Sequence, residues 1–122
     1  MFKATHPILG TRDMPRAIAF YVDKLGFEIA FESPPEAPQY VGYRRDAVEI
    51  HMQFQLEHEM SRTRLRFVVE DPDALCDEYQ RRGVECSPAG IQTTAWGTRE
   101  FALWDPDRNA LTFYRNVPKE DG

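Results

Sequence analysis

The stretch that decides the fold runs from Asp13 to Glu28 and reads DMPRAIAFYVDKLGFE. Asp13 is a good helix N-cap, a proline follows in the first turn, and apolar residues then recur at helical spacing. Gly26 ends the pattern, because glycine readily adopts the left-handed conformation that closes a helix. We therefore expect one amphipathic helix that begins at Met14 and ends at Leu25.

The same pattern returns in the stretch DPDALCDEYQRRGVE at residues 71–85. Asp71 is the cap, Pro72 follows it, and Gly83 closes the helix. The two caps are offset by about 58 residues, which is the period of an internal repeat. The chain is therefore expected to contain one module twice.

Segments with strand-like patterns flank each helix in the same order. One precedes each helix, at residues 3–11 and 64–69, and three follow, at residues 27–33, 40–45 and 48–55 and at residues 84–87, 98–104 and 110–115. Each half is thus predicted to have its elements in the order βαβββ. We predict an α+β fold in which two tandem βαβββ modules form a curved mixed sheet around a cleft. The modules span about residues 1–57 and 64–116 of a single domain, and residues 119–122 form a disordered tail.

Composition narrows the class of protein. The chain has 122 residues, of which 42% are hydrophobic and 29% charged, as in an ordinary globular domain. A net charge of −5 argues against nucleic-acid binding, which normally requires a basic stripe. The apolar runs are too short to span a membrane, and the first residues lack the apolar core of a secretory signal, so we expect a cytoplasmic protein. Cys76 is expected to be a reduced, buried thiol on the second helix.

Strand alternation indicates which polar side chains face the cleft. In residues 48–55 the apolar residues alternate with Glu49 and His51, so these two side chains share the face opposite the core. The same reasoning places on the cleft side His6 of the first strand, Arg64 and Arg66 of residues 64–69, and Thr112 of the last strand.

These residues resemble a known family. His6, Asp13, Arg16, the pair Phe20-Tyr21 and the run Leu25-Gly26-Phe27 resemble the opening module of the vicinal oxygen chelate superfamily, which includes glyoxalases, extradiol dioxygenases, fosfomycin-resistance transferases and bleomycin-binding proteins. The run WGTREFAL at residues 96–103, followed by Asp105-Pro106, is similar to bleomycin-resistance proteins in particular. The resemblance covers about residues 4–115.

The resemblance implies a divalent metal held by side chains from four strands. Its four positions match His6, His51, Arg64 and Thr112. A guanidinium cannot bind a metal ion and a threonine is a poor ligand, whereas metal sites in enzymes normally have at least three protein ligands. We therefore expect no metal cofactor. The alternative is one divalent ion bound by His6 and His51 with Glu49 or Glu100 as the third ligand, in a metal-dependent lyase, dioxygenase or transferase.

The function that this resemblance favours is a metal-independent protein that binds and sequesters a small molecule, such as a bleomycin-type antibiotic. A binder of some other metabolite fits the residues nearly as well. The resemblance also implies a homodimer, often with the first strand exchanged between protomers. We expect no catalytic residues, and ligand-binding residues are predicted at His6, Phe31, Tyr40, Glu49, His51, Arg64, Arg66, Trp96, Glu100 and Thr112. For Phe31 and Tyr40 the alternative is ordinary strand packing, and for Trp96 it is a place in the core.

Overall fold

The chain divides into two compact units in a computed structural model, which describes residues 1–118. Unit 1 comprises Met1–Thr63, and unit 2 begins at Arg64. The tail predicted to be disordered, residues 119–122, lies outside the described residues.

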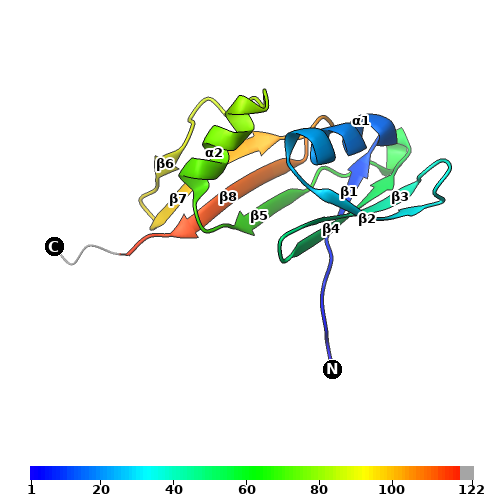
Figure 1. Cartoon of the computed structure of the whole chain (residues 1–122), viewed down its shortest axis with the longest axis horizontal. Helices are drawn as coiled ribbons and strands as arrows, with labels where there is room; N and C mark the ends of the chain where they lie inside the picture. The colour runs from blue at the N-terminus through cyan, green and yellow to red at the C-terminus, as the bar shows by residue number, and fades with distance from the viewer. Residues whose placement is uncertain (119–122) are drawn as a thin grey trace. The chain divides into compact units, whose positions relative to one another are not determined.

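Each unit has one helix and four strands in the order βαβββ (Figure 1). Unit 1 contains β1 (Ile8–Thr11), α1 (Met14–Ala19), a wide helical turn (Phe20–Lys24), β2 (Glu28–Ser33), β3 (Tyr40–Arg45), β4 (Val48–Phe54) and a short 3-10 turn (Glu57–Glu59). Unit 2 contains β5 (Arg64–Val68), α2 (Pro72–Arg81), β6 (Gln92–Thr93), β7 (Thr98–Trp104) and β8 (Ala110–Asn116). The predicted α+β class and the tandem βαβββ modules are confirmed.

The two sheets have the same topology. Their strand orders are β1-β4-β3-β2 and β5-β8-β7-β6, with the first pair parallel in each and the other pairs antiparallel. In the parallel pairs Ile8 lies opposite His51, and Arg66 lies opposite Thr112. His51 of unit 1 and Thr112 of unit 2 therefore occupy equivalent positions. His6 and Arg64, which stand two residues before Ile8 and Arg66, also correspond.

Both helices begin as predicted, but the first one changes form halfway. The carboxylates of Asp13 and Asp71 accept hydrogen bonds from backbone N–H groups three residues later, at 3.1 and 3.0 Å. The predicted single helix is wrong beyond Ala19, because Leu25 N–H donates to the carbonyl of Phe20, five residues earlier, at 3.0 Å. A hydrophobic pattern of period 3.6 gives no signal for this wider turn.

The predicted strand at residues 84–87 is also wrong. Only Cys86 forms a bridge there, to Leu103, and the fourth strand of the sheet is β6 instead. Val84 is buried. Ser87 N–H donates to the carbonyl of Ala102 at 2.9 Å, so the segment is hydrogen-bonded to β7 over a short distance without forming a strand. Pro88 follows at once and has no N–H with which to continue a ladder.

The first strand is shorter than predicted and starts at Ile8. Pro7 lacks an N–H, although its carbonyl still accepts from His51 N–H at 2.9 Å. The strand faces follow the predicted alternation: Leu9, Ile50 and Met52 are buried in unit 1, as are Leu111 and Phe113 in unit 2. Among residues 1–118, no helix is both long enough and apolar enough to cross a membrane.

Candidate functional site

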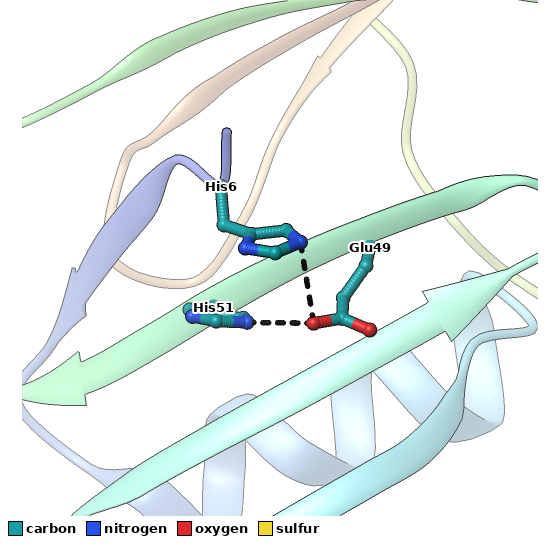
Figure 2. Close-up of side chains that lie close together, drawn as sticks. All are labelled: His6, Glu49 and His51. Atoms are coloured by element: carbon teal, nitrogen blue, oxygen red, sulfur yellow. Dashed lines mark hydrogen bonds and ion pairs between the residues drawn. The ribbon is translucent and has the colours of Figure 1, made fainter. Parts of the chain in front are cut away.

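Three side chains on the open face of the unit 1 sheet form what we call the histidine–glutamate cluster: His6, Glu49 and His51. Glu49 and His51 are two residues apart on β4 and so point to the same face, while His6 lies just before β1, the neighbouring strand. The Nε2 atoms of His51 and His6 lie 2.9 and 3.4 Å from the same oxygen, Oε2 of Glu49 (Figure 2). The two imidazole rings stack with their centroids 4.5 Å apart.

Glu49 is held in its ionised form by its surroundings. The hydrogen bond with His51 and the one from Arg44 Nη2, at 2.7 Å to Oε1, lower the pKa of the Glu49 carboxyl. Glu49 and His51 are largely shielded from solvent, with side chains 21% and 14% exposed. One carboxylate thus interacts with a guanidinium through one oxygen and with two imidazoles through the other.

Two aromatic residues surround His51. The hydroxyl of Tyr40 lies 2.8 Å from Nδ1 of His51, which fixes the orientation of the imidazole ring. The Phe31 ring contacts the His51 ring edge-on, with the ring centroids 5.2 Å apart. It also stacks against the Tyr40 ring, with a centroid separation of 6.0 Å. Of the predicted ligand-binding residues, five therefore come together in unit 1: His6, Phe31, Tyr40, Glu49 and His51.

Gly42 makes this arrangement possible, and sequence reasoning missed it. Gly42 lies opposite Phe31 on one side and opposite His51 on the other, so it occupies the position between the two rings. A Cβ atom on Gly42 would lie only 2.3 Å from Cε1 of Phe31. Because Gly42 has no side chain, the phenyl ring of Phe31 can occupy this space. The alternation of residues 40–45 could have shown that Tyr40, Gly42 and Arg44 share one face.

The open face of unit 2 carries a different set of groups. Arg66 Nη1 lies 3.3 Å from Oε2 of Glu100, and the guanidinium lies over the ring of Tyr114 at 4.2 Å. Arg66, Glu100 and Thr112 line a pocket of about 150 Å³ with Gln92 and Ser87. The side chain of Glu100 is only 10% exposed, so its carboxylate is a buried charge beside this pocket. Three more predicted residues are thus brought together.

The remaining two predicted residues stand apart. Arg64 and Trp96 are exposed, and within residues 1–118 neither side chain has a hydrogen bond, ion pair or ring contact. With 70% of its surface exposed, Trp96 is not the core tryptophan that we considered as an alternative.

Unit 1 also contains a pocket that the sequence did not suggest. It has a volume of about 340 Å³ and lies where α1 begins, lined mainly by apolar groups of Met14, Ile18, Ala37, Pro38 and Phe54. The proline-rich stretch before β3 was the available signal, because it contributes one wall of this pocket.

The donor set of the histidine–glutamate cluster fits a divalent transition metal. The ligand atoms of His6, Glu49 and His51 all lie within 4.8 Å of one another. Two imidazole nitrogens and a carboxylate oxygen are the donor types of many zinc and iron sites. In unit 2 the equivalent positions carry Arg64 and Thr112, which provide no comparable donors.

Comparisons with known proteins agree with this architecture. Residues 3–113 match the family model described as the Glyoxalase/Bleomycin resistance protein/Dioxygenase superfamily. The chain is 25% identical over 130 residues to a bleomycin resistance protein of Geobacillus stearothermophilus, a match that covers 91% of this chain and 95% of that protein. It is 29% identical to the bleomycin-binding protein of Streptomyces verticillus solved with copper(II)-bleomycin, with a TM-score of 0.76 and 98% of each chain covered. The bleomycin resistance determinant of transposon Tn5 shares the fold, with 22% identity, a TM-score of 0.77 and coverage of 94% of this chain and 98% of that one. This chain belongs to the glyoxalase/bleomycin resistance protein/dioxygenase superfamily.

Proposed function

We propose that this protein binds a small molecule of the bleomycin type and sequesters it without chemical change. It would act by mass action as a cytoplasmic homodimer, lowering the concentration of free ligand. Support comes from the relatives whose names record bleomycin resistance or binding. We propose no reaction for the protein.

The observation that carries this proposal is the exposed aromatic surface on the unit 1 sheet. Phe31 remains 39% exposed although it packs against Tyr40 and His51. Ile8, which lies opposite His51 on the neighbouring strand, is 46% exposed. Flat π-faces left open to solvent suit a ligand with planar heteroaromatic rings, because stacking then buries apolar area on both partners.

Polar groups on the sheet of each unit are available to a ligand. In unit 1 the imidazoles of His6 and His51 can exchange hydrogen bonds with it, and Glu49 can accept them. In unit 2 the pocket beside Glu100 and Arg66 offers a buried carboxylate and a guanidinium to polar groups of the ligand. Arg64, Trp96 and Thr112, together with Phe31 and Tyr40, complete the ten residues that we propose for ligand contact.

Capture of this kind needs no metal ion supplied by the protein. Stacking and hydrogen bonding to the residues named above provide the contacts, so chelator-treated protein is expected to bind as well as untreated protein. This separates the proposal from a metal-dependent reaction, which a chelator would abolish.

Isothermal titration of chelator-treated protein with metal-free bleomycin tests the proposal, and tryptophan emission, to which the exposed Trp96 contributes, provides a second signal. We expect saturable binding that Phe31→Ala weakens about five- to tenfold, since one aromatic contact contributes roughly 1 kcal/mol. Phe2→Ala is the matched control, because Phe2 is fully exposed at 103%. A titration without heat or emission change would exclude bleomycin as the ligand. Light scattering after size-exclusion chromatography tests the proposed dimer.

A further inference from the structure

We propose that the pocket at the start of α1 is a second ligand site, which binds a small carboxylate with a short apolar tail, and that Glu57 competes with this ligand for Arg12. The inference does not rest on the proposed capture of bleomycin, because it concerns other residues on the other face of the unit 1 sheet.

The first argument is the position of the pocket. Phe54, which lines it, alternates along β4 with Glu49 and His51 and therefore points to the opposite face of the sheet. α1 lies over this face, and Met14 and Ile18 of α1 form further walls (Figure 1). The sheet itself thus separates the pocket from the aromatic surface proposed for bleomycin.

The second argument is the size and the lining of the pocket. Its volume of about 340 Å³ is at the lower end of the range typical of small-molecule sites, about 300–1,000 Å³. The side chains of Ile18, Pro38 and Phe54 line it and are each only half-buried, so an apolar group bound here would remove more of their surface from water. A single ring or a short alkyl chain suits this volume, whereas a glycopeptide of the bleomycin type is too large.

The third argument is the positive charge of Arg12 at the pocket. Two contacts position its guanidinium: Nη1 donates to the carbonyl of Gln55, and Cζ lies 5.4 Å from the centre of the Phe54 ring. The side chain of Arg12 is 35% exposed, so the guanidinium is partly shielded from water. A guanidinium can bind a carboxylate through two parallel hydrogen bonds, which makes a carboxylate the matching polar group for this pocket.

Glu57 is the competitor for this guanidinium. Its Oε2 lies 3.4 Å from Nε of Arg12, and the side chain of Glu57 is 90% exposed. An ion pair that is so exposed contributes little to stability, so a ligand carboxylate held by the pocket can take the place of Glu57 at Nε. Removing the charge of Glu57 should therefore strengthen binding of the ligand.

Asp13 limits the ligand to one negative charge. Its carboxylate also lines the pocket, and Oδ1 accepts a hydrogen bond from Arg16 N–H at 3.1 Å as the cap of α1. The carboxylate of Asp13 would repel a second negative charge on a bound ligand. A monocarboxylate is therefore favoured over a phosphate monoester, which carries a charge of about −1.5 to −2 at pH 7.

Isothermal titration of the full chain with 3-phenylpropionate, and separately with hexanoate, tests the inference. We expect saturable binding of one molecule per chain. The uncharged 3-phenylpropanamide should bind about tenfold more weakly than 3-phenylpropionate, since it lacks the charge-assisted hydrogen bonds, and phenyl phosphate should also bind more weakly. In NMR spectra the methyl signals of Met14 and Ile18 should shift on titration, whereas those of Ile8, which lies outside the pocket, should not.

Two pairs of variants test the charges. Arg12→Gln should weaken binding of 3-phenylpropionate about tenfold or more, and Arg62→Gln, which removes an exposed arginine outside the pocket, should leave it unchanged. Glu57→Gln should tighten binding about two- to fivefold. Glu36→Gln is its matched control, because it changes the net charge equally at an exposed position that does not line the pocket.

A third pair tests the apolar wall. Ile18→Ala should weaken binding about fivefold, because it removes apolar contact area, and Ile8→Ala is the same substitution outside the pocket and should have no effect. Circular dichroism and urea unfolding establish that each variant is folded before its titration is interpreted.

The inference is overturned if neither carboxylate binds saturably, if Arg62→Gln weakens binding as much as Arg12→Gln, or if Glu57→Gln fails to tighten it. Bleomycin titrations of Arg12→Gln and Ile18→Ala should match the wild type, since both residues lie outside the surface proposed for bleomycin. Failure of the carboxylate site therefore leaves the capture proposal intact, and failure of bleomycin binding leaves these outcomes unaffected.

Discussion

Replacement of Gly42 by alanine should displace the Phe31 ring from its contacts with Tyr40 and His51 while preserving the sheet. The new methyl group would lie 2.3 Å from Cε1 of Phe31, well inside van der Waals contact, so the phenyl ring has to leave. At 39% exposure, Phe31 can rotate into solvent. The edge-on contact with His51 and the stacking on Tyr40 are then lost together.

The expected change in stability is the difference between two opposing terms. Each lost aromatic contact contributes about 0.5–1.5 kcal/mol, so losing two destabilises the fold by roughly 1–3 kcal/mol. Alanine is favoured over glycine inside a strand by about 0.5–1 kcal/mol. We therefore expect Gly42→Ala to lower the free energy of unfolding by about 1–2 kcal/mol.

A double-mutant cycle with Phe31→Ala isolates the steric cause. When the phenyl ring is absent, the methyl group meets no obstacle, and Gly42→Ala should become neutral or stabilise by roughly 0.5 kcal/mol. Urea unfolding of the four proteins gives these values, and the ring signals of His51 in NMR spectra report loss of the edge-on contact in Gly42→Ala. Equal destabilisation in both backgrounds would refute the reasoning, since the clash would then involve something other than Phe31.

Three further predictions concern unit 2. Asp105→Ala removes three hydrogen bonds in the turn between β7 and β8, two of them from Asn109 at 2.9 and 2.8 Å, so urea unfolding should show a loss of about 3 kcal/mol. Cys76 is buried and its pKa is raised to about 11, so this thiol should resist alkylation at pH 8 until the protein is unfolded; rapid labelling of native protein would contradict its burial. Arg99 holds the pKa of Asp73 below its usual range, so this ion pair stabilises the fold at neutral pH and loses its effect as the pH falls below about 4. Asp73→Asn should therefore cost roughly 0.5 kcal/mol at pH 7, with a smaller difference at pH 3.

Much of the fold could be predicted because both repeats carry the same signals for the start and the end of their helix. A capping aspartate, a proline in the first turn and a closing glycine mark both helices, and Gly26 and Gly83 indeed have φ angles of 77° and 80°. The strands next to the core alternate cleanly, so their faces were predictable. The structure of the segment after Gly83 could not be predicted. A short apolar run before a proline has the pattern of a strand whether or not it pairs with a neighbouring strand.

The candidate site was predictable only where it depends on strand faces. The alternation of β4 places Glu49 and His51 together, and the position of His6 before the first strand follows from the resemblance. The contact between Phe31 and His51 depends on the register of three strands and on the missing side chain of Gly42. Hydrophobic alternation and turn geometry set the register of a sheet, but the register shift between Ile29 and Phe31 in β2 interrupts that alternation, so the pairing of Phe31 with Gly42 could not be predicted.

The two units show how a duplicated scaffold can separate two kinds of chemistry. Where unit 1 has His6 and His51, the register of unit 2 places Arg64 and Thr112. Imidazoles can bind a transition metal or exchange protons, whereas a guanidinium and a hydroxyl can only recognise charge and polarity. Because the backbone pairing is the same in both sheets, this difference comes from the side chains alone.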